Sequence, residues 1–448
     1  MKKNNTKWIG AGMLVLLGLM IGFIVLFKNN KKEEILPLKE RQGAMAKGSE
    51  WAKTKENVAK LIQKISEKPD DPEPRVQLAQ LYMEEARITG DHQYYDMASL
   101  RLLNSVLKKD PNHFEALCFK SMVLLSQHHF SEGLDEADKA ISINGYNAFV
   151  YGLAVDGNVE LGNYDDAVKN SDKMVSIRPD LSSYSRISYL REIYGDNDGA
   201  IDAMKMAVSA GFPGLEQTSW CRVQLGKLYE NKGDLTNAKL EYEIALSQRP
   251  DYAYAYAGEA RIEKYNKNYK QAIADIQKAQ GLVNDYGFYD ELSELFKLNG
   301  EPAKAKQTAE ELVNKLNKDA ETGNSDDQIG HYADKELAYA YLKTGNNNKA
   351  MEHALIEYNR RPNNIDVNEA LAWVNYKMGN VKDADKYISV AMKTNSQNPT
   401  LLCQAGIIKS KLGDKEKGNL LIKKALSLDP YLSQDLTNEI KPYLAMNN

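Results

Sequence analysis

Small and apolar residues recur along this chain at the spacing of amphipathic helices, and the helices come in short pairs. Residues 218–250 show the pattern most clearly. Gly233 suits the end of a first helix, Asp234 can cap a second one, and Pro250 follows the second. The apolar faces are lined by Leu225 and Tyr229 in the first helix and by Ala238, Tyr242 and Ala245 in the second. The stretch therefore predicts two helices packed against each other.

The same two-helix unit repeats over most of the chain. A small residue opens the second helix of each unit, and consecutive ones lie 33–38 residues apart except for one interval of 45. The ten positions are Ala98, Gly133, Ala167, Ala200, Ala238, Ala272, Ala305, Ala350, Ala384 and Gly418. The interval of 45 comes from a polar loop or helix extension at 317–328, and the first unit carries an insertion at 87–95 between its helices.

These signals divide the chain into eight segments. The segments are a basic tail (1–7), an apolar span (8–27), a polar linker (28–48), a helix before the repeats (49–68), units 1–7 (69–316), an inserted polar segment (317–330), units 8–10 (331–431) and a terminal helix with its tail (432–448). No two-helix unit buries enough apolar surface by itself, so we expect the units to stack and the terminal helix to cover the last one.

The unit at 218–250 resembles the tetratricopeptide repeat (TPR). The family pattern is Leu-Gly-x-x-Tyr, followed by Gly, Ala, an aromatic residue, Ala and Pro at fixed offsets. It is matched by Leu225, Gly226, Tyr229, Gly233, Ala238, Tyr242, Ala245 and Pro250. The aromatic residue expected near the start is displaced, because Arg222 holds that place and Trp220 lies two residues earlier. The resemblance implies an all-α fold, a right-handed superhelix of about ten helix-turn-helix repeats.

Residues 8–27 carry no charge and as a helix would span about 30 Å, the thickness of the hydrocarbon core of a bilayer. We expect a retained transmembrane anchor from Trp8, which suits an interface, to Phe27. Gly18 and Gly22 have the spacing of a helix-pairing motif, although chance accounts for it in a glycine-rich span. The alternative is a cleaved signal peptide, whose apolar core is usually shorter and followed by small residues.

Lysines on both flanks leave the orientation of this anchor open. We expect a single-pass protein of the bacterial inner membrane with its repeats facing the periplasm, and repeats facing the cytoplasm are the alternative.

Catalytic and metal-binding signatures are missing from the sequence. The net charge of −4 argues against nucleic-acid binding, and the cysteines lie too far apart for a zinc or redox motif. We interpret Cys118, Cys221 and Cys403 as small buried residues, and His128 and His129 as a surface turn. We therefore expect no enzyme activity, no cofactor and no metal.

The first helix of each unit offers a face opposite its packed side, which in the TPR family lines a concave groove for peptides or partner helices. Aromatic residues and cations on this face would suit a protein interface. Transferring the offsets to each unit gives Phe149, Tyr189, Trp220, Lys227, Tyr254, Arg261, Tyr332, Lys335, Tyr339, Trp373 and Tyr376 as candidate groove residues.

These features favour a membrane-anchored scaffold that binds proteins or peptides in a bacterial envelope assembly. Two alternatives remain open, a regulatory subunit of a membrane or cell-wall synthesis enzyme and an organelle import or chaperone co-receptor. The cation clamp of the chaperone-tail receptors is not present as a set, because Lys227, Arg261 and Lys335 are isolated cations.

Overall fold

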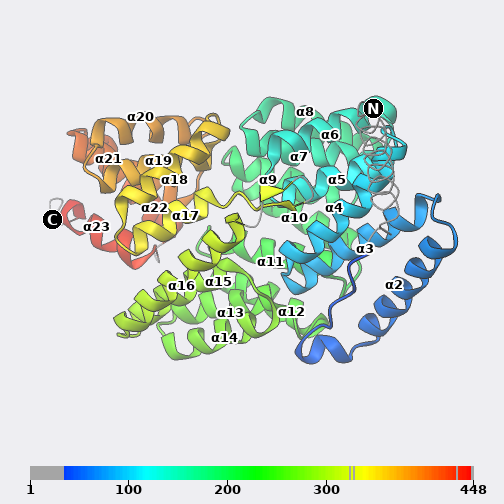
Figure 1. Cartoon of the computed structure of the whole chain (residues 1–448). Helices are drawn as coiled ribbons and strands as arrows, with labels where there is room; N and C mark the ends of the chain where they lie inside the picture. Colours follow the sequence, from blue (N-terminus) through cyan, green and yellow to red (C-terminus); the bar gives the residue numbers. More distant parts are fainter. Residues whose placement is uncertain (1–34, 322–323, 326–327, 430–431, 445–448) are drawn as a thin grey trace, which may run out of the picture. The chain divides into compact units, whose positions relative to one another are not determined.

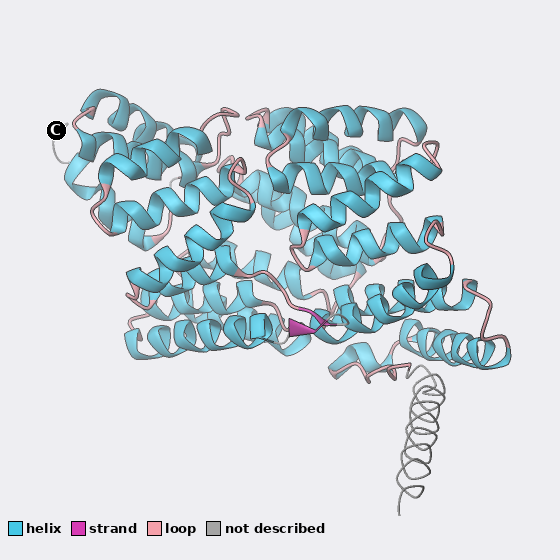
Figure 2. Cartoon of the chain, turned by 45° about the horizontal axis from the view of Figure 1, so that its top comes forward, coloured by secondary structure: helices cyan, strands magenta, loops and turns pink. Residues whose placement is uncertain are grey.

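The computed structural model describes residues 35–321, 324–325, 328–429 and 432–444 (Figure 1). The chain divides into two units, residues 1–39 and residues 40–448, and the described part of the first has no regular secondary structure. The described part of the second consists of 22 α-helices, one 3-10 helix and a short two-stranded ribbon (Figure 2). The all-helical, TPR-like solenoid expected from the sequence is thus confirmed.

Twenty of the helices form ten consecutive hairpins, which follow η1 (Gly43–Lys47) and α2 (Ser49–Glu67). The hairpins are α3 (Glu73–Thr89) with α4 (His92–Lys109), α5 (Phe114–Ser126) with α6 (Phe130–Ile143), α7 (Ala148–Leu161) with α8 (Tyr164–Ile177), α9 (Leu181–Ile193) with α10 (Asn197–Ala210), α11 (Glu216–Glu230) with α12 (Leu235–Gln248), α13 (Ala253–Tyr265) with α14 (Tyr269–Leu282), α15 (Tyr286–Leu298) with α16 (Pro302–Glu321), α17 (Asp334–Lys343) with α18 (Asn347–Arg360), α19 (Ile365–Lys377) with α20 (Val381–Ala391), and α21 (Pro399–Leu412) with α22 (Lys415–Leu428). The last helix is α23 (Gln434–Leu444).

Small residues let the two helices of a hairpin approach each other. All ten residues predicted to open the second helices are buried, most of them completely. In the fifth unit the ring of Tyr242 fills the space left by glycines on both sides, because a Cβ on Gly226 or on Gly258 would lie 2.3 or 2.6 Å from its carbons. The core therefore depends on pairing a large ring with positions that have no side chain.

Two irregular places in the array differ from the expectations in detail. In the first unit the residues expected as an insertion at 87–95 belong mostly to α3 and α4, which have 17 and 18 residues, whereas most other helices of the hairpins have 13–15. At 317–330, α16 extends to Glu321, and a ribbon of β1 (Asn324–Ser325) and β2 (Gln328–Ile329) follows. Most of the extra residues that the structure describes at these two places therefore extend helices, and only a few of them form loops.

The predicted anchor at 8–27, with Trp8, Gly18, Gly22 and Phe27, lies outside the described residues. Among the residues that are described, no helix is both long enough and apolar enough to cross a membrane. The end of the predicted linker is held in place, because the buried Arg41 pairs with Glu85 at 2.5 Å and with Glu50 at 2.8 Å. Within the polar linker expected over 28–48, Arg41 is therefore fixed against α2 and α3.

Units 8–10 lie against units 2–5, which precede them by about 200 residues (Figure 1). Turns within the earlier units approach the backbone that follows the second helices of the later units so closely that a Cβ on each turn glycine would lie 2.3–3.1 Å from it. The three contacts join Gly162 to Asn363, Gly195 to Asn395 and Gly233 to Leu428. We call these contacts, together with the polar contacts of residues 128–164 with 330–365, the fold-back interface.

Candidate partner-binding surface

The first helices of units 3, 4 and 5 line a cavity of about 530 Å³. Its walls come from residues three or four apart on α9 and α11, which is the spacing of a single helix face. Tyr189 and Trp220 line it with 41% and 40% of their surfaces exposed, and the exposed Lys227 lies two turns further along α11 than Trp220. These three candidate residues share one concave surface, which we call the inner surface.

A second cavity of about 400 Å³ continues the first, because Asp156, Arg186 and Tyr189 line both. Its far wall comes from unit 8 and includes the candidate Lys335. Units far apart in the sequence therefore enclose one space. A third cavity, of about 270 Å³, holds Tyr254, whose hydroxyl donates to Asp285 at 3.1 Å.

Two lysines of the inner surface form no ion pair with any described residue. Burial, and then the nearby Arg261, lower the pKa of Lys227. Burial also acts to lower the pKa of Lys335, but the carboxylates of Asp366 and Glu336 outweigh it and raise this pKa. Both ammonium groups can therefore donate to an incoming carboxylate or carbonyl group.

Carboxyl groups that interact with Lys335 are also affected by burial. Burial and the adjacent Asp366 raise the pKa of Glu369 to about 8, so this group stays protonated at neutral pH. One carboxylate oxygen of Glu336 is buried without a hydrogen-bond partner among the described residues. The inner surface thus combines exposed aromatic rings with donors and acceptors that the described protein leaves partly unused.

Arg261 differs from the other candidate cations because its guanidinium is fully engaged. It donates to Glu230 at 3.0 Å, to Glu291 at 3.1 Å and to the Tyr242 hydroxyl at 3.2 Å. Arg261 belongs to unit 6 and its partners to units 5 and 7, so it connects three successive units. The prediction that Arg261 is an isolated cation of the groove is therefore wrong.

Other candidate residues are covered by protein. Trp373 is only 7% exposed and stacks on Tyr376 with 4.9 Å between ring centroids. Tyr376 and Tyr339 are half-buried and pack, with α23, into one apolar cluster. Phe149 contacts Phe119 edge to face. The prediction that Trp373 lines an open groove is therefore wrong, because α23 covers this residue.

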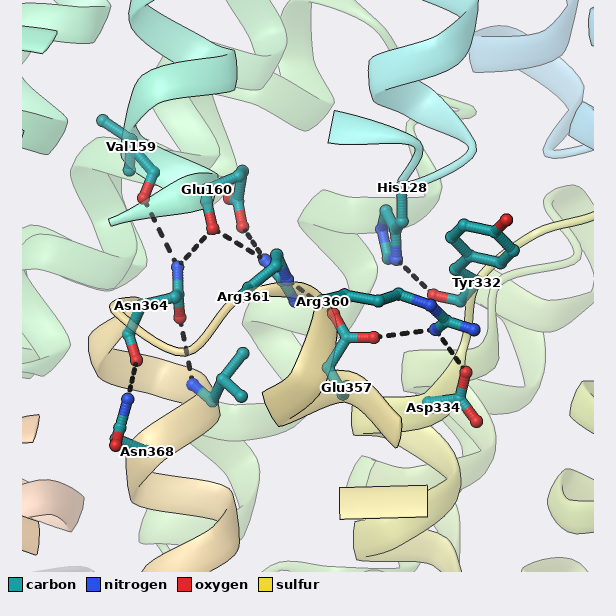
Figure 3. Close-up of polar contacts among 11 residues, drawn as sticks. His128, Val159, Glu160, Tyr332, Asp334, Glu357, Arg360, Arg361, Asn364 and Asn368 are labelled. Carbon is teal, nitrogen blue, oxygen red and sulfur yellow. Dashed lines mark hydrogen bonds and ion pairs between the residues drawn. The ribbon is translucent and has the colours of Figure 1, made fainter. Parts of the chain in front are cut away.

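Tyr332 lies in the fold-back interface, which the sequence did not predict (Figure 3). Its ring stacks on His129, and Arg360 lies over its ring, 3.8 Å from the centroid. His128 Nδ1 donates to the Tyr332 carbonyl oxygen at 2.9 Å, and His129 Nε2 donates to that of Gly330 at 2.8 Å. The interpretation of both histidines as a surface turn is wrong, because His129 is buried.

A buried arginine forms the other half of this interface. Arg361 bonds to Glu357 within α18 and to Glu160 at the end of α7, and its guanidinium lies over the Phe130 ring (Figure 3). Asn364 donates to the Glu160 carbonyl oxygen at 3.0 Å. These are polar contacts between residues about 200 apart, and the repeat pattern contains no signal for them. The expectation that the cysteines are buried is confirmed, as all three are buried free thiols.

One match to a family model supports the repeat assignment of the fifth unit. Residues 221–252 match the family model of the tetratricopeptide repeat. A thermophilic TPR protein of Thermus thermophilus is 20% identical over 43% of this chain and 98% of its own, with a TM-score of 0.38. The human IFIT1 dimer with PPP-AAAA is 14% identical over 73% of each chain, with a TM-score of 0.48. No curated protein matches the sequence.

Neither likeness carries a ligand or a partner over to this chain. The matched segment covers the end of α11 and all of α12, and the other hairpins of the described residues repeat the design of that pair. The described chain is therefore a helical-repeat protein, and one of its units, residues 221–252, matches the tetratricopeptide repeat.

Proposed function

We propose that this protein is a scaffold that binds partner proteins or peptides along the inner surface of its repeats, without catalysis of its own. The observation that carries the proposal is the exposure of Tyr189 and Trp220 beside one continuous cavity. Partly exposed aromatic rings on a concave wall are typical anchors of protein interfaces. Lys227 and Lys335 supply charges that a carboxylate of the partner would satisfy.

We propose further that residues 8–27 tether the scaffold to the bacterial inner membrane, with the repeats in the periplasm as part of an envelope assembly. The support is the uncharged run of apolar residues flanked by lysines. Protease added to intact and to lysed cells tests this sidedness. Digestion of the repeats once the outer membrane is opened, with the inner membrane intact, is expected, and full protection at that stage would contradict it.

Cross-linked capture from membranes, with the full chain as bait, tests the binding surface. The variants Tyr189→Ala and Trp220→Ala are expected to lower recovery of the partner at least tenfold, since losing one aromatic anchor costs about 2 kcal/mol or more. Tyr146→Ala is the matched control, because Tyr146 is 87% exposed and lines none of the three cavities described above. Equal recovery with all variants would remove the inner surface from the proposal.

A further inference from the structure

The terminal helix α23 occupies the inner side of the last units. Leu432, just before α23, and Leu436 and Ile440 within it lie four residues apart and are all buried. They pack in one cluster with Trp373 of α19 and with Leu402, Cys403 and Ile407 of α21. The apolar face of α23 therefore fills the place that the candidate groove residues of units 8 and 9 were expected to leave open.

The polar side of α23 reaches well beyond the last hairpin. Asp435 pairs with Lys297 of α15 at 2.5 Å. Glu439 pairs with Lys377 of α19 and accepts a hydrogen bond from Tyr376 at 2.9 Å. A helix that only covered the last unit would contact α21 and α22 alone. Contacts with units 7 and 9 show instead that α23 lies across the ends of several first helices.

We propose that α23 is an internal substitute for a partner helix. On this proposal the surface formed by units 7–10 binds, in place of α23, an amphipathic helix with apolar residues at four-residue steps. The partner helix carries carboxylates where α23 has Asp435 and Glu439, opposite Lys297 and Lys377. This inference rests on the proposed scaffold function and names the class of partner that one part of the scaffold takes.

The contacts of α23 fit an exchangeable helix. It has 11 residues, a length at which an isolated helix is marginal, so its order depends on the surface beneath it. The ion pair of Asp435 with Lys297 is about half exposed and so contributes little to holding the helix in place. Three apolar side chains, at the spacing used by helices that bind in grooves, supply most of the attachment.

A labelled synthetic peptide of residues 432–444 tests the exchange on the full chain. In the double variant Leu436→Asp/Ile440→Asp the internal helix loses its anchors, and we expect the peptide to bind at least tenfold more tightly than to the unaltered chain. Leu420→Asp is the control, because Leu420 is 67% exposed on α22, so that the substitution adds an aspartate nearby without removing a buried side chain. It is expected to leave peptide binding as weak as in the unaltered chain.

Charge reversal tests the orientation of the bound helix. A peptide with Glu439→Lys is expected to bind the double variant at least fivefold more weakly, and Lys377→Glu added to the protein is expected to restore binding. A folded double variant that does not bind the unaltered peptide would overturn the proposal.

Hydrogen exchange of the unaltered chain decides the matter even where the double variant fails to fold. Amides of α23 are expected to exchange at least tenfold faster than those of α21, because an exchangeable helix opens without unfolding the repeats. Equal protection of the two helices would make α23 a fixed part of the fold. A captured partner that saturating peptide does not displace from the double variant would overturn this inference but leave the scaffold function standing.

Discussion

Single positions decide how closely parts of this molecule approach each other. At the turn between α7 and α8, Gly162 has a φ of 80° and faces the backbone of Asn363 from unit 8. Gly345, at the equivalent turn of unit 8, has a φ of 79° but no atom within 4 Å of the place of a Cβ. The two glycines thus share a backbone conformation and differ in what surrounds them.

This difference gives a prediction for the pair of variants Gly162→Ala and Gly345→Ala. Both pay for a left-handed conformation, roughly 1 kcal/mol. Only Gly162→Ala also places a methyl group 2.3 Å from the carbonyl carbon of Asn363, which costs about 1–3 kcal/mol more. Urea unfolding of both variants measures the difference, and equal losses of stability would mean that units 3 and 8 do not touch.

Residues of the unit pattern could be predicted because each follows from a local rule. Ala238 and Tyr242 are buried as expected, since helical spacing places them on the packed face. Arg261 shows the limit of such rules. Its offset indicated an inner cation, but whether it is free depends on Glu230 and Glu291 in neighbouring units, and no local rule contains them.

At the scale of elements, α18 joins units 8–10 to the earlier units of the array. It packs on α17 and α19 in the usual way through Ala350 and Ala354, and its C-terminal end reaches across to α7. Arg361, directly after the helix, is almost fully buried between Glu357 and Glu160. One short helix end therefore provides both a nearest-neighbour contact and a long-range one.

We expect Arg361→Met to separate units 8–10 from units 2–5. The substitution keeps the length of the side chain. It leaves the partly buried carboxylate of Glu160 without its ion-pair partner and the buried carboxylate of Glu357 with Arg360 alone, which costs about 3 kcal/mol. Lys349→Met on the same helix is the control, because its ion pair with Glu352 is half exposed.

Thermal unfolding and the radius of gyration in solution measure both effects of this change. Arg361→Met is expected to unfold at lower temperature and to expand, whereas Lys349→Met is expected to match the unaltered chain. A compact Arg361→Met variant with unchanged unfolding would contradict the role given to this ion pair.

At the scale of the molecule, the fold-back interface is rich in histidine. His331 lies beside His128, with 4.2 Å between ring centroids, and His129 and His92 are near. Burial, and then His128, lower the pKa of His331 to about 3, while Glu336 acts in the opposite direction. The folded chain therefore keeps His331 neutral at pH values where the unfolded chain, with a pKa of about 6.5, begins to bind a proton.

The sign of this shift predicts how the interface responds to acid. The contribution of neutral His331 to the stability of the fold is complete above about pH 6.5. It is lost gradually as the pH falls towards 3, because protons then favour the unfolded or opened state. His331→Gln removes the titrating group. The difference in unfolding temperature between the unaltered chain and this variant is expected to change in favour of the variant between pH 7.5 and pH 5. A constant difference would contradict the assignment.

The order and number of units could be predicted from the sequence, but their return onto earlier units could not. Stacking of neighbours follows from a repeated apolar face, which leaves a periodic signal. The turn glycines of the fold-back interface recur in units that make no such contact, and its two histidines and its arginine each resemble a surface residue when considered alone. Likewise the apolar side of α23 was predicted, but the units that it reaches were not.

The separation of about 200 residues between Gly162 and Asn363 has a consequence for how such a chain can change over generations. An open array tolerates gain or loss of a hairpin, since each copy meets only its flanking copies. Here, deleting one hairpin between units 3 and 8 would shift units 8–10 by one hairpin relative to the turn glycines that they now contact. The number of hairpins in this array is therefore constrained by its own geometry. Duplication of a hairpin would need compensating changes on both sides of the fold-back interface.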